Sequence, residues 1–297
     1  MKLRLALVIL LVALSPAARA QENRRVSVAV LDMGGTPAAG RVAERLSKLL
    51  ATLRLKGATL ALLDRGMSAA AARGVGYAGS LNLTLAEARA LGAAVGCDFF
   101  ITGDAQTVRR SSSERPAYFE AYASVFVVSS QTGRLVLWDR PAAEAGTAGG
   151  AEAALLAKLE GGAQLYAGAI GIQAEREERE RFSTEGGEAA AVIDLSTGEG
   201  ASANRDLREP EPYRRLRPAY TDAAARAEAE ATVDALVEVG ADGEVSGVRV
   251  VRWAGFGLDE EVVETVRRMH FRPAQREGEP VAVRVLLRYN FRKPPKS

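Results

Sequence analysis

The last apolar stretch of the chain, residues 281–291, places an apolar side chain on every second position. The apolar set is Val281, Val283, Val285, Leu287, Tyr289 and Phe291. The set between them is Ala282, Arg284, Leu286, Arg288 and Asn290. A period of two puts successive side chains on opposite faces of a β-strand. The sequence therefore predicts a strand with one face in a core and cationic groups on the other.

The residues before this strand predict the rest of a small domain. Residues 231–239 and 245–253 alternate like strands and are joined by a turn sequence that favours a hairpin. Residues 258–271 have the apolar spacing of a helix, with Asp259 as its expected N-cap. The order strand, strand, helix, strand predicts a β-β-α-β unit over residues 213–292, with the helix packed on one face of the sheet.

Residues 24–170 alternate strand-like and helix-like patterns, which predicts an α/β sandwich-type domain. The expected strands are residues 26–31, 59–65, 98–108 and two strands within 117–140. The expected helices are residues 38–57, 84–96 and 150–171, the last with an interruption at Gly161-Gly162. Thr84 and Glu87 have the spacing of a capping box. The whole chain is thus predicted to be a two-domain protein that combines α/β and α+β parts.

Between these two regions the pattern becomes polar. Residues 171–212 begin with a charge run and continue with Ser, Gly, Asn and Pro, which is typical of a linker. Within it, residues 189–195 are apolar enough to add a strand to a neighbour, although the sequence does not say which one.

Residues 1–20 have the pattern of a secretory signal peptide. Two basic residues precede an apolar run, and a small-x-small end predicts cleavage between Ala20 and Gln21. An uncleaved inner-membrane anchor that keeps Met1 is the alternative, but the apolar run is shorter than the ~20 residues that span a bilayer. The sequence therefore predicts an exported protein.

Composition narrows the function classes. The net charge is +2 and the basic residues are mixed with acidic ones, so nucleic acid is not an expected partner. His270 and Cys97 are the single histidine and the single cysteine, which leaves no catalytic triad, multi-histidine metal site or internal disulfide. We expect a surface histidine and a buried thiol.

Other motifs that could bind a ligand or catalyse a reaction are equally few. Residues 74–79 match a Gly-x-Gly-x-x-Gly pattern, but the sequence predicts a helix rather than a strand before them, which favours a connector over a nucleotide-binding loop. Asp64, Asp104 and Asp139 lie near predicted strand ends without a second convergent group. We expect no enzyme activity, no cofactor, no metal site and no small-molecule substrate.

The C-terminal region resembles the C-terminal domain of TonB-family proteins. The resemblance rests on an ordered set of motifs: Tyr220 with Ala223 and Ala224, Thr232-Val233, Asp242-Gly243, Val248 to Val251, Leu258-Asp259 and Phe271 to Ala274. It covers about 75 residues, and the spacing agrees throughout. Three residues depart from the family pattern: Thr221, Ala231 and Met269. These differences affect the expected partner contacts more than the expected fold.

In this family the final strand is a sheet edge to which an extended peptide of an outer-membrane transporter adds. The resemblance implies a docking strand in this chain and a tyrosine near its entrance. The implied partner-binding residues are Tyr220, Val281, Val283, Arg284, Val285, Leu286, Leu287, Arg288 and Tyr289. It also implies a periplasmic, non-enzymatic protein that supports transport across the envelope.

Residues 26–140 are similar, more weakly, to the periplasmic N-terminal domain of TolB and to the curli-secretion and penicillin-binding-protein-activator lipoproteins. No single activity follows from this similarity. Two alternatives therefore remain open. In the first, the chain is a structural or self-associating envelope protein that can form a homo-oligomer. In the second, it keeps its N-terminal anchor and transduces energy.

Overall fold

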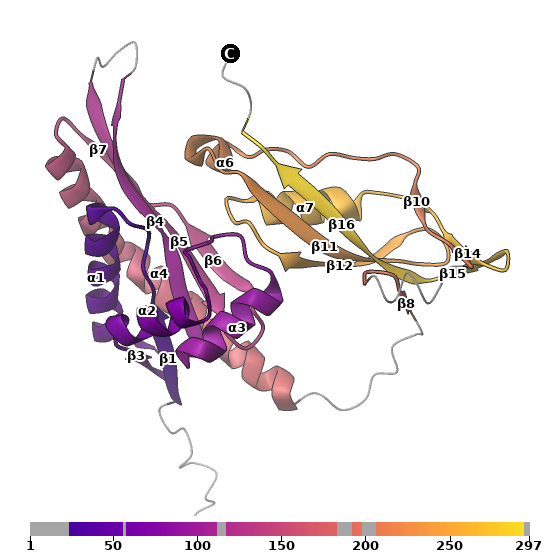
Figure 1. Ribbon diagram of the computed structural model, residues 1–297, viewed down its shortest axis with the longest axis horizontal. Coiled ribbons are helices and arrows are strands. Elements are labelled where there is room, and N and C mark those ends of the chain that lie inside the picture. Colours follow the sequence, from indigo (N-terminus) through magenta and orange to yellow (C-terminus); the bar gives the residue numbers. More distant parts are fainter. Residues whose placement is uncertain (1–23, 56–57, 112–116, 183–191, 198–205, 294–297) are drawn as a thin grey trace, which may run out of the picture.

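The computed structural model describes residues 24–55, 58–111, 117–182, 192–197 and 206–293, which form two folded parts packed against each other (Figure 1). The predicted signal peptide, with its cleavage site between Ala20 and Gln21, lies outside the described residues.

The N-terminal part is built on a seven-stranded sheet with the order β2-β3-β1-β4-β5-β6, in which β7 also pairs with β5. Its strands are β1 (Arg24–Val30), β2 (Arg54–Leu55), β3 (Ala58–Leu62), β4 (Phe99–Arg110), β5 (Tyr118–Ser129), β6 (Leu135–Asp139) and β7 (Ala142–Ala145). β1 runs parallel to β3 and β4, and β5 is antiparallel to β4, β6 and β7.

Helices cover both faces of this sheet (Figure 1). They are α1 (Pro37–Thr52), α2 (Arg65–Gly74), α3 (Leu85–Val95) and α4 (Ala148–Phe182). On one face, the apolar stripe of α1 packs with α4 against the odd-numbered residues of β5, such as Val125 and Val127. On the other face, Phe126 and Val128 pack with α2, α3 and the C-terminal part. The predicted capping box of Thr84 and Glu87 is present at the start of α3.

Helix α4 differs most from its prediction, because it runs through Gly161-Gly162 without interruption. A Cβ atom on Gly162 would lie 2.8 Å from the hydroxyl of Tyr166, so this glycine makes room for a buried side chain. The Tyr166 hydroxyl donates to Asp139 Oδ2 at 2.7 Å. Packing, rather than a helix break, thus explains the small residue there.

Two further boundaries differ from the sequence prediction. α1 ends at Thr52 instead of residue 57, because Arg54–Leu55 turns back as β2 and pairs with β3. β7 was not predicted; it lies beside β5, where a short alanine-rich segment gives no clear strand signal.

The C-terminal part has a four-stranded main sheet with the order β12-β11-β16-β8. Two smaller sheets, β15-β14-β9 and β10-β13, extend it. The strands are β8 (Ile193–Asp194), β9 (Leu207–Arg208), β10 (Glu211–Pro212), β11 (Ala231–Val239), β12 (Val245–Arg252), β13 (Phe271–Arg272), β14 (Ala274–Arg276), β15 (Glu279–Val281) and β16 (Val283–Phe291). The helices are α6 (Asp222–Ala227) and α7 (Leu258–Arg267).

Helix α7 covers one face of the main sheet, where Val262 and Val266 share a core with Val233 and Val237. The turn between β11 and β12 has Gly243 at φ 84°, as the hairpin sequence predicts. The α+β two-domain fold and the small C-terminal unit with its helix on one sheet face are confirmed.

The described residues of the predicted linker, 171–212, belong to both parts. Residues 171–182 continue α4, with Ala174 and Glu177 buried. β8 pairs with β16, β9 with β14, and β10 with β13. The apolar stretch that the sequence left unplaced therefore supplies an edge strand to the main C-terminal sheet, through Ile193.

Aromatic residues join the two parts. Phe126 of β5 stacks on Trp253 at 5.7 Å between ring centroids and meets the edge of Phe256 at 5.6 Å. Trp138 of β6 lies 5.5 Å from Phe256, and the Trp253 indole N–H donates to the Gly133 carbonyl at 3.1 Å. One continuous hydrophobic core thus spans the boundary between the two parts.

Candidate functional site

The edge of β16 is the first candidate site, because the resemblance assigns partner binding to it. β16 lies between β11 and β8 in the sheet order. Its antiparallel register with β11 runs over the whole strand, from Ala231 opposite Phe291 to Val239 opposite Val283. β8 is parallel to it and reaches only Val283 and Arg284. In the described part of the chain, no strand pairs with this side of β16 beyond Arg284.

The backbone groups that point to this open side follow from one hydrogen bond. The Leu195 amide donates to the Arg284 carbonyl at 2.8 Å. Since the amide and carbonyl of one residue in a strand point to the same side, and alternate residues point the same way, those of Leu286, Arg288 and Asn290 also face outward. The odd-numbered residues then direct their amides and carbonyls to β11.

The side chains of the odd-numbered residues pack on the α7 face. Val283 is buried, and Val285, Leu287 and Tyr289 are half-buried against the same core. These positions therefore build the domain, as the apolar alternation predicts. Val281 departs from the prediction: it lies in β15 and pairs with Ala274, because the chain folds back through a turn at residues 277–278. It is not part of the open edge.

Arg284 and Arg288 form ion pairs on the opposite face of the sheet. The guanidinium of Arg284 is 2.6 Å from Glu238 Oε1 and 3.4 Å from Asp194 Oδ2. Arg288 donates to both carboxylate oxygens of Asp234, at 2.7 and 2.9 Å. These contacts pair cationic and anionic side chains on neighbouring strands, which is a favourable cross-strand arrangement.

Asp234 also accepts from Arg252 Nε at 3.2 Å and is almost completely buried. Burial opposes its ionisation, but the hydrogen bonds and charges of Arg288 and Arg252 outweigh burial and hold its pKa below the ordinary value. Asp234 is therefore an anion that keeps Arg288 on this face. Leu286, between the two arginines, is 38% exposed and lies opposite Leu236.

Tyr220 lies at the Phe291 end of β16, with the two rings 6.5 Å apart. Its hydroxyl is 2.8 Å from the Ala229 carbonyl and 3.2 Å from the Ala224 carbonyl. These contacts tie α6 to the start of β11. The structure thus places Tyr220 beside the end of the strand, in a tethering role, rather than on its open edge.

The other residues singled out from the sequence are not brought together. Residues 74–79 connect the end of α2 to the segment before α3, so no strand precedes the glycine pattern. Asp64 caps α2 through the Met67 amide. His270 is exposed, with Nδ1 2.8 Å from Glu244 Oε1. Cys97 is buried, and burial raises the pKa of its thiol to about 11.

The described residues show no cluster of three or more metal-binding side chains. Across the same residues, no helix combines the length and hydropathy needed to cross a bilayer.

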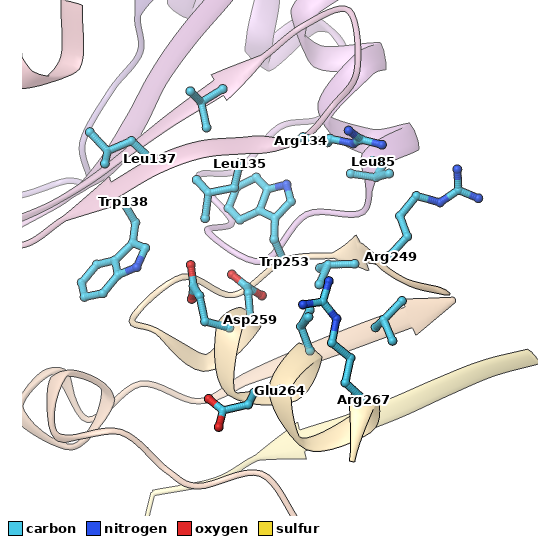
Figure 2. Close-up of a pocket in the computed structure, with 15 residues that line it drawn as sticks. Leu85, Arg134, Leu135, Leu137, Trp138, Arg249, Trp253, Asp259, Glu264 and Arg267 are labelled. Carbon is cyan, nitrogen blue, oxygen red and sulfur yellow. The ribbon is translucent and has the colours of Figure 1, made fainter. Parts of the chain in front are cut away.

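A second candidate site, which the sequence did not reveal, is a groove between the two parts (Figure 2). It has a volume of about 830 Å³ and is lined by β6, β12 and α7, with Leu85 of α3 at one end. Its lining residues extend from Leu85 to Arg267, over more than half of the chain, so no local pattern could have identified it.

Asp259 lies in the wall of this groove and differs from its predicted role as N-cap of α7. The N-cap is Gly257, at φ 75°, and Asp259 lies in the first turn of the helix. Its carboxylate reaches back to accept from the amides of Ala254 and Gly255, at 2.9 and 2.8 Å. Burial raises its pKa from 3.8 to about 7, and the neighbouring Glu260 adds to this rise.

Together, these elements define a two-domain protein whose C-terminal sheet contains a strand, β16, that is only partly paired on one side. The family model of the Gram-negative bacterial TonB protein C-terminal matches residues 217–292. The C-terminal part is therefore a TonB-like C-terminal domain, as the sequence motifs predict.

Solved structures are similar at low identity. The TonB C-terminal domain of Pseudomonas aeruginosa is 20% identical over 36% of this chain and 100% of that chain, with a TM-score of 0.27. The LpoB C-terminal domain from Salmonella enterica is 17% identical over 40% of this chain and 83% of that chain, with a TM-score of 0.27. Lipoprotein GNA1162 from Neisseria meningitidis is 12% identical over 45% of this chain and 94% of that chain, with a TM-score of 0.28. A comparison with curated proteins found no match.

Proposed function

We propose that this protein is an exported, periplasmic, non-enzymatic binding protein of the TonB family. Its C-terminal domain captures an extended peptide of an envelope partner, by resemblance the periplasmic segment of an outer-membrane transporter, in support of transport. The peptide adds as a strand to the outer edge of β16, so that backbone hydrogen bonds supply affinity and side-chain contacts supply selection.

The observation that supports this proposal best is β8. A segment of the same chain pairs in parallel with the first two residues of β16, and the Leu195 amide donates to the Arg284 carbonyl at 2.8 Å. This edge therefore has the geometry that accepts a strand. The outward backbone groups of Leu286, Arg288 and Asn290 offer the next positions along it.

The side chains along this edge suit an amphipathic partner. Leu286 offers an exposed apolar surface, while Arg284 and Arg288 flank it with charges already balanced by Glu238 and Asp234. A partner strand thus gains apolar contact at the centre without having to neutralise either arginine. The two arginines also discourage unspecific edge pairing, because charged side chains on edge strands oppose aggregation.

An NMR titration of the ¹⁵N-labelled chain with a synthetic peptide from the periplasmic N-terminal segment of an outer-membrane transporter tests the proposal. We expect the largest amide shifts at Leu286, Arg288 and Asn290, since these amides form the new ladder. Shifts confined to other strands would refute strand addition at β16. Concentration-dependent self-association through the same amides, without peptide, would favour the self-assembly alternative instead.

The start of the mature protein separates the remaining alternatives. N-terminal sequencing that begins at Gln21 supports an exported accessory protein. A chain that keeps Met1 supports an anchored protein that transduces energy.

A further inference from the structure

The groove between the two parts combines two apolar walls. On the side of the N-terminal domain, β6 contributes Leu135, Leu137 and Trp138. On the other side, β12 and α7 contribute apolar side chains, among them Val248 and Val263, and Trp253 lies between the walls (Figure 2). Its volume of about 830 Å³ lies within the range of about 300–1,000 Å³ that is usual for ligand pockets.

One wall of the groove is a strand edge. β6 is the last strand in its sheet order, and among the described residues only β5 pairs with it. The Ala123 amide donates to the Pro141 carbonyl at 3.0 Å, so the carbonyl of Pro141 points to β5. By alternation the amide and carbonyl of Asp139 also point to β5, and those of Trp138 point away from β5, to the groove side. The extended backbone of a bound segment could therefore form hydrogen bonds with the amide and carbonyl of Trp138.

The groove is lined by three arginines and also by the acidic residues Asp259, Glu260 and Glu264. Arg134, Arg249 and Arg267 are exposed and stand together at one end (Figure 2). Within the described part of the chain, no acidic side chain pairs with any of them. This distinguishes them from the arginines of the β16 face, which are held by Glu238 and Asp234. Three arginines, one directly before β6 and one each in β12 and α7, thus line the groove without a paired carboxylate, whereas Glu264 pairs with Arg268 outside it.

We propose that this groove binds an extended acidic polypeptide segment of a partner protein. The segment adds to the outer edge of β6, buries its apolar side chains against Leu137 and Val263, and places acidic side chains at Arg134, Arg249 and Arg267. Strand edge and apolar walls select an extended chain, and the three guanidinium groups select carboxylates and fix its direction.

This site is separate from the β16 edge. In the C-terminal sheet, β12 is at one end of the order and the side of β16 that takes β8 faces the other end. The protein thus has two strand-accepting edges, one in each domain. Their occupants differ in charge, because the arginines at the groove lack acidic partners and those on β16 have them.

The test uses the full chain and two synthetic peptides labelled with fluorescein, Glu-Glu-Val-Thr-Val-Tyr-Val-Thr and the same peptide with Lys-Lys in place of Glu-Glu. Fluorescence anisotropy measures binding. We expect the acidic peptide to bind at least about tenfold more tightly than the basic one. We also expect this preference to fall as salt rises from about 0.05 to 0.5 M, because exposed charges are screened.

Variants assign the binding to the groove. The triple variant Arg134→Gln, Arg249→Gln, Arg267→Gln should lower the affinity for the acidic peptide by about tenfold or more. Each exposed ion pair contributes modestly, so the three substitutions are combined. Arg226→Gln is the control, because Arg226 is an exposed arginine of α6 that does not line the groove. Val263→Asp should abolish binding through its charge in the apolar wall, with circular dichroism confirming the fold.

Equal binding of the two peptides, or unchanged binding by the triple variant, would overturn the proposal. So would a dimer of the chain that Val263→Asp dissolves, because the occupant would then be a second copy. Leu286→Pro, which alters the β16 edge alone, should leave the acidic peptide bound, so failure of the peptide site on β16 is distinguishable from failure of this one.

Discussion

The side chain of Asn82 pairs with the backbone of Thr232 as a neighbouring strand would. The Thr232 amide donates to Asn82 Oδ1 at 3.0 Å, and Asn82 Nδ2 donates to the Thr232 carbonyl at 2.8 Å. The same Nδ2 is 2.6 Å from the Trp253 carbonyl. The ladder between β11 and β12 ends with Asp234 opposite Arg252, so Asn82 pairs with Thr232, two residues further along β11, where β12 no longer reaches.

This relationship connects the two domains through polar groups as well as aromatic ones. The Trp253 amide donates to the Leu83 carbonyl at 3.2 Å, and Thr84 forms a bridge with Arg252. A segment of the N-terminal domain therefore acts as a short edge strand of the C-terminal sheet. The groove between the domains depends on this fixed geometry.

Asn82→Ala should destabilise the protein. It leaves the amide and carbonyl of Thr232 without partners at a partly buried site, and each such loss costs about 1–3 kcal/mol. We expect a lower midpoint in urea unfolding and a weaker Phe126–Trp253 contact, seen as altered tryptophan fluorescence. Asn290→Ala is the control: Asn290 is exposed on β16 and accepts from the Thr232 hydroxyl at 2.8 Å, but it does not pair with the Thr232 backbone, so we expect a change within about 0.5 kcal/mol. Equal effects of the two substitutions would contradict the bridging role.

The interface explains where prediction from the sequence succeeds and where it fails. Local patterns such as the Thr84–Glu87 capping box, the glycine in the β11–β12 turn and the alternation of β16 predict their elements because the physical cause lies within a few residues. The partner of β8 was not predictable, since Ile193 pairs with a strand about 90 residues later in the chain.

Prediction of the candidate sites succeeds and fails for the same physical reason. The alternation of residues 283–291 predicted which side chains enter the core, but not which backbone groups face outward, because that depends on which neighbour pairs on which side. The prediction of Asp259 as the N-cap was wrong for a related reason: its carboxylate oxygens accept from the amides of Ala254 and Gly255, across a turn in which Gly255, Phe256 and Gly257 all have positive φ. The groove could not be predicted from the sequence, because its lining residues come from both domains.

Proline substitutions at two adjacent positions of β16 should have opposite consequences. Leu286→Pro removes an amide that points to the open side, so the folded domain should persist while peptide capture at β16 is lost. Leu287→Pro removes an amide directed to β11 and leaves the Ala235 carbonyl unsatisfied, which should lower the free energy of unfolding by about 1–3 kcal/mol or more. Thermal unfolding by circular dichroism separates the two. A greater loss of stability in the Leu286 variant would show that the assignment of outward residues is reversed.

Asp259 should make the stability depend on pH. Its pKa is about 7 in the folded protein against an ordinary value of 3.8, so the folded state binds the proton more tightly. The free energy of unfolding contributed by this group is then fully present below about pH 4 and is lost as pH rises to about 7. We expect the stability difference between the wild type and Asp259→Asn to shrink over this interval in urea titrations. Glu260→Gln, a neighbouring exposed position, should retain most of the slope, and a difference that grows with pH would contradict the assignment.

Gly255→Ala should weaken the contact between the domains. Gly255 has φ 72°, and a Cβ atom there would lie 2.5 Å from Phe126 Cε1, so the ring that stacks on Trp253 would have to move. The positive φ costs a non-glycine residue about 1–2 kcal/mol, and overpacking adds about 1–3 kcal/mol. Gly76→Ala is the matched control, because Gly76 has φ 78° with no atom within 4 Å of the added Cβ. The difference in unfolding free energy between the two variants isolates the steric effect on Phe126. Equal destabilisation would mean that backbone strain alone acts, and that the Phe126–Trp253 stack tolerates a methyl group between the domains.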